Sequence, residues 1–190
     1  MFHLIDRPSD LEYLSKELCL QSNIGIDTEF RRKGKYDIQL SLLQVYDSEE
    51  IYLIDCIAIE ESKSLCSFLG SKNVEKVFHS CKEDIEALLS WTDIRLVNFF
   101  DTQLANAFLG ETFSISYQDL VKQILGVSID KNETRSNWIR RPLSNSQLAY
   151  AASDVQFLLE LYSYQMNIFQ DSYKLKWFKE ELEFITSKIY

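Results

Sequence analysis

The chain has 190 residues, of which 46% are hydrophobic and 26% charged, a composition typical of a globular domain and not of a disordered or fibrous protein. No apolar run approaches the roughly 20 residues that a membrane helix needs, and the net charge of −9 argues against broad adhesion to nucleic acid through a basic surface. Four cysteines without a CxxC pair and only two histidines argue against a zinc site.

Helical spacing and strand-like stretches predict a helix, a strand meander and then alternating elements. Ser9 is expected to cap a first helix, in which Leu11, Leu14 and Leu18 recur at helical spacing. Short links between the first three strands predict an antiparallel meander. The strands are predicted at 23–30, 39–46, 51–54, 74–79 and 97–100, and further helices at 60–69, 83–91, 102–109, 117–125, 146–169 and 172–188. This order indicates a mixed sheet covered by helices, with ligands bound at strand ends.

The organisation of the chain predicts one domain over residues 1–190. Five glycines and two prolines leave no segment typical of a flexible linker, and there is no internal repeat. The first residues lack a basic segment followed by an apolar one. We therefore expect no signal peptide, no membrane partner and a cytoplasmic location.

Asp27 and Glu29 are the first candidate metal ligands, because they follow an apolar run on a predicted strand. Residues two apart on a strand point to the same face, so the two carboxylates would repel each other unless a cation lies between them. Mg²⁺ or Mn²⁺ suits oxygen ligands of this kind. The same spacing occurs at Asp47 and Glu49, where we assign no site. A strand-end pair that faces water is therefore the alternative interpretation.

Tyr150 and Asp154 form a second candidate pair, four residues apart and so on one face of a predicted helix. The alanines beside them would let this helix approach a sheet closely, which favours a buried functional face. A tyrosine packed beside a solvated acid is the alternative. Asp84 starts another predicted helix, where its simplest role is to complement the helix dipole.

Six short segments stand in the order of a known set of motifs. Three are 25–30 (Gly-Ile-Asp-Thr-Glu-Phe), 78–86 and 150–155, and the supporting three are 39–44, 100–105 and 134–144. Together they resemble the ribonuclease D family, within the DEDD exonucleases of the tyrosine subtype. Tyr150 indicates the subtype, because the histidine subtype has its histidine at the position occupied here by Ala149.

The resemblance implies an α/β, RNase H-like fold, with a mixed five-stranded sheet in the order 3-2-1-4-5 flanked by helices. It also implies two divalent ions, Mg²⁺ or Mn²⁺. Asp27 would bridge both ions, and Asp84 would hold the second. Glu29 and Asp154 would complete the ion that binds the attacking water, which Tyr150 would orient.

Residues beside these motifs are candidates for substrate binding. Phe30 and Gln44 are candidates for the pocket of the terminal base, since aromatic faces stack on single-stranded bases, although core packing is an equal alternative for Phe30. His79 would contact a nucleotide or a phosphate, with a hydrogen-bonded structural role as the commoner alternative. The candidate set is completed by Thr28, Arg31 and Arg135. Basic residues also cluster near the acidic motifs. They would either guide phosphate groups to the site or simply be solvated in loops. They are Arg31, Arg32, Lys33, Lys35, Arg135, Arg140 and Arg141.

The implied function is a 3′→5′ exoribonuclease that releases nucleoside 5′-monophosphates from RNA 3′ ends, for example in transfer-RNA or small-RNA processing. A Werner-type exonuclease acting on single-stranded DNA is the nearest alternative, and a non-catalytic RNA-binding module is the alternative from another class. Ribonuclease D usually carries two further helical domains, which we do not expect here. A homodimer is a hypothesis, in which the second subunit would supply the RNA-binding surface that those domains provide. The aromatic stripe at Tyr173, Trp177, Phe178 and Phe184 is a candidate interface, with packing as its commoner role.

Overall fold

A computed structural model describes residues 1–34, 37–59, 62, 65–129, 133, 136–170 and 172–189. Within these ranges six strands form one mixed sheet: β1 (Phe2–Ile5), β2 (Asn23–Arg32), β3 (Ile38–Tyr46), β4 (Ile51–Asp55), β5 (Glu75–Phe78) and β6 (Phe99–Asp101). The helices are α1 (Pro8–Leu18), α2 (Ser67–Gly70), α3 (Lys82–Thr92), α4 (Thr102–Phe108), α5 (Tyr117–Leu125), α6 (Asn145–Val155), α7 (Leu158–Phe169) and α8 (Lys174–Ser187). None of these helices is long and apolar enough to cross a membrane.

The strand order is β1-β4-β3-β2-β5-β6. The strands β2, β3 and β4 form the predicted antiparallel meander, and the pairs β1–β4, β2–β5 and β5–β6 are parallel. Numbered from β2, the last five strands have the order 3-2-1-4-5, so the predicted fold is confirmed. The edge strand β1 was not predicted. It has only four residues and owes its extended form to pairing with β4.

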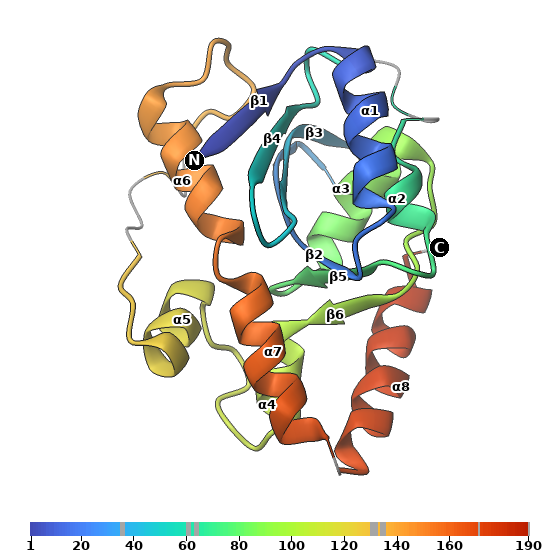
Figure 1. The fold of residues 1–190 in the computed structure, drawn as a ribbon, viewed down its shortest axis with the longest axis vertical. Coiled ribbons are helices and arrows are strands. Elements are labelled where there is room, and N and C mark those ends of the chain that lie inside the picture. Colours follow the sequence, from blue (N-terminus) through green and yellow to red (C-terminus); the bar gives the residue numbers. More distant parts are fainter. Residues whose placement is uncertain are drawn as a thin grey trace.

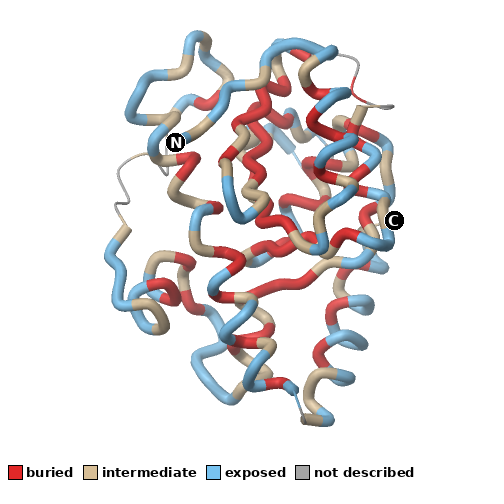
Figure 2. The backbone as a smooth tube through the Cα atoms, viewed as in Figure 1, coloured by how far each residue is buried: buried red, intermediate tan, exposed pale blue. Residues whose placement is uncertain are grey.

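Helices cover both faces of the sheet. The face of Thr28 is covered by α3, because the Thr28 hydroxyl donates to Asp84 on that helix. The opposite face, which holds Gly25, lies against the junction of α6 and α7. In Figure 1, α6 and α7 follow one another along one side of the sheet. Figure 2 shows the buried residues gathered along the strands and the inner sides of the helices. The central strand β3 is buried from Leu40 to Val45, which fits a strand covered on both faces.

Three predicted helices differ from the structure. The first helix has Arg7 at its N-cap and Pro8 at its first position, so the predicted cap at Ser9 is wrong. Of the helix predicted at 60–69, the described residues form only the short α2, whose helical part begins at Ser67. The apolar pattern before it belongs to core packing, as the fully buried Ile59 and Cys66 show.

The helix predicted at 146–169 is two helices, α6 and α7, and the structure shows why. The Tyr117 hydroxyl donates to the carbonyl of Ser153 at 3.2 Å and accepts from the backbone N–H of Phe157 at 3.1 Å. These are the two groups that would bond to each other in a continuous helix. A side chain inserted in this way interrupts the helix. The insertion is a long-range contact, so the local pattern could not predict it.

Gly25 sets how closely the junction of α6 and α7 approaches the sheet, and Gly25→Ala tests this. The added Cβ would lie 3.1 Å from the Leu158 Cβ and 3.3 Å from the Val155 carbonyl oxygen. We expect a loss of about 1–3 kcal/mol in the free energy of unfolding, since the packing is already full. Urea denaturation measures it. Gly34→Ala is the control, because an added Cβ there meets nothing within 4 Å. Equal stability of the two variants would contradict the prediction.

Candidate active site

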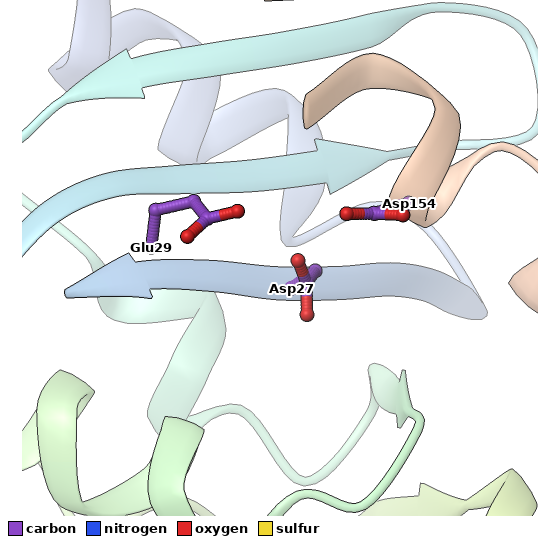
Figure 3. A group of neighbouring side chains, drawn as sticks. All are labelled: Asp27, Glu29 and Asp154. Atoms are coloured by element: carbon purple, nitrogen blue, oxygen red, sulfur yellow. The ribbon is translucent and has the colours of Figure 1, made fainter. Parts of the chain in front are cut away.

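Three carboxylates from two elements meet at one place on the sheet. Asp27 and Glu29 lie two residues apart on β2, and Asp154 is the second-last residue of α6. One oxygen from each lies within 4.8 Å of the others. Figure 3 shows the two β2 side chains beside one another, with Asp154 reaching the same space from the helix. Strand alternation and the close approach of α6 thus bring distant residues together.

Asp84 approaches the cluster from the other face of the sheet. It is the third residue of α3, and its Oδ1 accepts a hydrogen bond from the Thr28 hydroxyl at 2.5 Å. Thr28 is therefore placed as a support for Asp84. Burial is the main cause that raises the pKa of both Asp27 and Glu29, and repulsion from Asp84 adds to it in each case, so the charge of Asp84 acts on the cluster. The structure brings Asp27, Glu29 and Asp154 together and links Asp84 to β2 through Thr28, and the metal roles of all four stay predictions.

The pKa values of the four carboxyl groups are all raised. Burial raises the pKa of Asp27 well above its usual range, and repulsion from Asp84, Asp154 and Glu29 adds to this effect. Burial, then repulsion from Asp154 and Asp84, raises the pKa of Glu29 to about 9. Burial raises the pKa of Asp84 and that of Asp154 to about 7. Four such groups cannot all be ionised near neutral pH without positive charge nearby.

The donor set of this cluster fits divalent cations. All of its ligand atoms are carboxylate oxygens, which suit Mg²⁺ and Mn²⁺. The Oδ1 atom of Asp154 is buried and has no hydrogen-bond partner among the described residues. A buried carboxylate oxygen without a partner is costly unless a cation or a donor satisfies it. The observed cluster therefore supports a site for divalent ions.

Tyr150 stands one helical turn before Asp154 on α6. A side-chain hydrogen bond from Tyr150 lowers the pKa of Asp154, in opposition to burial. The Tyr150 ring packs against Trp138, with the ring centroids 6.1 Å apart. Tyr150 also lines a pocket of about 390 Å³ with Ser153 and Phe157. Its hydroxyl is therefore fixed beside a cluster carboxylate and next to an open space.

A polar network missed in the sequence analysis anchors the loop before α6. Arg141 binds Asp55 through two hydrogen bonds, Nε to Oδ2 at 2.6 Å and Nη2 to Oδ1 at 2.8 Å. It also donates to the carbonyl oxygens of Trp138 at 2.6 Å and Ser41 at 2.9 Å. Ser41 is the extra residue of a β-bulge in β3, opposite Glu29 and Phe30 of β2. The network thus joins β3 and β4 to Trp138, which is buried.

Arg141→Leu is expected to destabilise the protein by about 3 kcal/mol, since Asp55 would keep a nearly buried charge without its partner. The exposure of Arg141 places this value at the lower end of the usual range. Urea denaturation measures the loss, and Arg140→Leu at the exposed neighbouring position is the control. A loss below about 1 kcal/mol would show that the ion pair does not anchor the loop.

His79 is held by the protein on both ring nitrogens. Its Nε2 donates to the carbonyl of Ile115 at 3.0 Å, and its Nδ1 lies 2.9 Å from the Thr102 hydroxyl. Burial lowers its pKa, so the neutral ring is favoured. His79 also lines a small pocket of about 110 Å³ with Asp27 and Asp154. It therefore borders the cluster while its nitrogens serve the fold.

The other predicted substrate-binding residues lie at varied depths. Phe30 is half-buried, with the Arg32 guanidinium 5.8 Å from its ring centroid. Arg31 is exposed and donates to the Gln39 side chain at 2.7 Å. Gln44 is fully buried, so contact with a base would need it to be uncovered. Two of the predicted basic residues, Arg135 and Lys35, lie outside the described residues.

A larger groove, of about 870 Å³, lies between β2, α3 and the end of α8. Arg32, Lys82 and Lys188 line it, together with acidic residues of α3. Arg32 is paired there with Glu86 at 2.6 Å and Glu83 at 3.4 Å. The groove includes none of the four carboxylates, so the acidic cluster, and not this groove, marks the candidate chemistry.

Three of the four residues of the predicted aromatic stripe at α8 lie at the surface. Tyr173, Trp177 and Phe184 are 68%, 53% and 56% exposed, whereas Phe178 between them is buried. Tyr173 packs edge-on against Trp177, with the ring centroids 4.7 Å apart. The predicted packing role therefore belongs to Phe178. Self-association through the exposed rings stays a prediction.

The sequence is similar to that of ribonuclease D. Ribonuclease D from Shewanella sp. (strain ANA-3) is 35% identical over 187 residues, with 94% of this chain and 48% of that protein covered. The chain therefore spans about half the length of this relative. The resemblance predicted from the six motifs is confirmed.

Comparison with solved structures gives the same result. Escherichia coli RNase D, described as an exoribonuclease involved in structured RNA processing, matches with a TM-score of 0.94 and 31% identity. The match covers this whole chain and 50% of that one. The catalytic core of RRP6 from Trypanosoma brucei matches with a TM-score of 0.88 and 25% identity, over 96% of this chain and 51% of that one. A model of the 3′-5′ exonuclease family matches residues 2–169, so the chain belongs to this family.

Proposed function

We propose that this chain is a metal-dependent 3′→5′ exoribonuclease, and the observation that carries the proposal is the assembled carboxylate cluster. Asp27, Glu29 and Asp154 hold carboxylate oxygens within 4.8 Å of one another, and the pKa values of these three acids and of the neighbouring Asp84 are all raised. A purely structural role would leave the repulsion between these acids uncompensated. Two divalent ions, Mg²⁺ or Mn²⁺, held by Asp27, Glu29, Asp84 and Asp154, would compensate it.

Each side chain of the cluster would have a separate role in hydrolysis. Divalent ions, when bound, would activate water and offset negative charge on the phosphate. Asp27, Glu29 and Asp154 hold their oxygens close enough to share one cation. The Thr28 hydroxyl fixes the orientation of Asp84. Tyr150, bonded to Asp154, would orient the attacking water, so no histidine base is needed. The products would be nucleoside 5′-monophosphates.

RNA is the proposed substrate because the matched relatives are named ribonuclease D and the matched E. coli structure is described as an exoribonuclease. DNA is the less favoured substrate. A cytoplasmic location, where RNA 3′ ends are available, is part of the same proposal. So is a homodimer through the exposed rings of α8, which would be rejected if light scattering detects only monomer at micromolar concentration.

Digestion of matched nucleic acids tests the proposal. RNA and single-stranded DNA of one sequence, each labelled at the 5′ end, are incubated with the protein in Mg²⁺, in Mn²⁺ and in EDTA. We expect a ladder of RNA products shortened from the 3′ end, weaker cleavage of DNA, and none in EDTA. Intact RNA, with identical behaviour of the wild type and Asp154→Ala, would reject an exoribonuclease. Preferential digestion of DNA would establish the alternative substrate.

Tyr150→Phe is expected to lower kcat about 10- to 100-fold with little change in KM, because only the hydroxyl beside Asp154 is removed. The ring contact with Trp138 is kept, so folding should be unaffected. Single-turnover cleavage of labelled RNA measures the effect. Tyr162→Phe is the matched control, since its hydroxyl donates to Glu75 instead of a cluster carboxylate. Equal kcat in the two variants would remove Tyr150 from the catalytic set.

A further inference from the structure

Gln44 is a fully buried amide at the centre of the sheet. It lies on β3 between two neighbours, opposite Asp27 of β2 and Leu53 of β4. Directly opposite residues of an antiparallel pair project to the same face, with their Cβ atoms about 4.5–5.5 Å apart. The Gln44 side chain therefore lies on the same face of the sheet as Asp27, on the neighbouring strand, and adjoins the carboxylate cluster.

Neither polar atom of this side chain has a partner in the part of the chain that the structure describes. Both Nε2 and Oε1 of Gln44 are buried and lack a hydrogen bond to any described residue. A buried polar group left unpaired costs about 1–3 kcal/mol, so a side chain of the same shape without the amide would be more stable at this position. The packing of the core therefore does not account for an amide here.

The other unpaired group of the cluster is an acceptor on the same face. Oδ1 of Asp154 is buried without a partner among the residues placed in the structure, and one oxygen of Asp154 lies within 4.8 Å of an oxygen of Asp27. Helix α6, which carries Asp154, packs on β2, β3 and β4. An unpaired donor and an unpaired acceptor thus flank Asp27. Figure 3 shows the space between Asp154 and the β2 carboxylates, with Asp27 below it.

We propose that Gln44 is a positioning residue whose Nε2 holds Oδ1 of Asp154 through one buried water, so that the other Asp154 oxygen faces the divalent ions. The proposal rests on the function proposed above. An amide suits this role, because it donates a hydrogen bond without adding a positive charge that would compete with the ions. Because the side chain is fully buried, it acts through Asp154 and not by touching RNA.

The test compares binding of Mn²⁺ alone to Gln44→Met, which keeps the shape and loses the amide. Residues that support metal ligands change metal affinity about 10- to 100-fold when removed. We expect Gln44→Met to weaken Mn²⁺ binding, measured by electron paramagnetic resonance, at least 10-fold. Its metal-free melting temperature should be unchanged or higher, and kcat on RNA should fall with KM nearly constant.

Gln165→Met is the matched control. Gln165 is also fully buried with an unpaired Oε1, but its Nε2 donates to the Thr102 carbonyl, away from the cluster. It should lose stability and keep wild-type Mn²⁺ affinity. Gln44→Asn and Gln44→Leu form a second pair of similar shape, in which only asparagine keeps the donor. Asparagine should bind Mn²⁺ more tightly than leucine.

Wild-type Mn²⁺ affinity in Gln44→Met, or equal affinity in the asparagine and leucine variants, would overturn the proposal. If Gln44→Met does not fold, the asparagine and leucine pair decides the matter. The readout is also independent of the substrate. A wild-type protein that binds Mn²⁺ but leaves RNA intact would refute the proposed function, while the comparison of affinities would still support or reject the role of Gln44.

Discussion

Asp27→Asn is expected to lower the rate of RNA cleavage on the order of 1,000-fold and to raise the melting temperature of the metal-free protein. The loss of activity follows from the central place of Asp27, since repulsion from each of the other three acids acts on it. A metal ion contributes several kcal/mol to the stabilisation of a transition state, and about 1.4 kcal/mol corresponds to a factor of ten.

The gain in stability has a separate cause. Burial and three like charges raise the pKa of Asp27, so its ionised form destabilises the folded state. Asparagine has nearly the same shape and no charge, which removes this repulsion. A variant that is more stable and inactive would distinguish a metal site from a structural cluster, because damage to the fold lowers stability as well as activity.

The measurements are single-turnover cleavage of labelled RNA and thermal denaturation in EDTA and in Mn²⁺. Mn²⁺ should raise the melting temperature of the wild type far more than that of Asp27→Asn. Glu49→Gln is the control, because Glu49 is exposed and forms with Asp47 a pair of the same spacing outside the cluster. An Asp27→Asn variant with wild-type cleavage would refute the two-ion site.

The strands could be predicted because their patterns are local and strong. The alternation and apolar runs of β2, β3 and β4 gave their bounds to within two residues. The helix α5 was predicted at its observed bounds, and α4 begins at the predicted residue Thr102, where Asp101 caps it through two backbone N–H groups. The short strand β1 could not be predicted in this way, because four residues carry little pattern and its partner β4 lies far along the chain.

The candidate site could be predicted only in part from residue spacing. Strand alternation places Asp27 beside Glu29, yet the same spacing at Asp47 and Glu49 has no site. Asp84 needed the family resemblance, since its link to the cluster is the long-range bond from Thr28. Arg141, paired with a residue 86 positions earlier, gave no local signal. Contacts of this kind depend on the finished fold.

The stability of the metal-free protein should fall as the pH rises from about 6.5 to 8. The carboxyl groups with raised pKa values keep protons in the folded state that the unfolded chain has lost, since ordinary carboxyl groups titrate near pH 4. When the folded state binds more protons, the free energy of unfolding decreases with pH, by about 1.4 kcal/mol per pH unit for each proton kept. Glu29, with a pKa of about 9, keeps its proton across this window.

Between about pH 6.5 and 8, the titration of the basic residues His79 and Lys76 contributes little to the change in the free energy of unfolding. Their contributions have the opposite sign to those of the carboxyl groups. Burial lowers the pKa of His79, so its contribution increases stability with pH only up to its ordinary value near 6.5. Burial also lowers the pKa of Lys76 to about 8, so its increase begins above the window. The slope between these limits therefore reports the carboxylate cluster.

Urea denaturation at several pH values, in EDTA and in saturating Mn²⁺, measures this slope. In Mn²⁺ the decline should disappear, because the ions bind the ionised carboxylates and stabilise the folded state more as the pH rises. In EDTA the free energy of unfolding of Asp27→Asn should decrease less steeply with pH than that of the wild type. Asparagine has no carboxyl proton to keep in the folded state, and the repulsion that acts on Glu29 is not increased. Metal-free stability that is constant or rises across the window would mean that the four carboxyl groups are ionised without cations, and the electrostatic case for a metal site would fail.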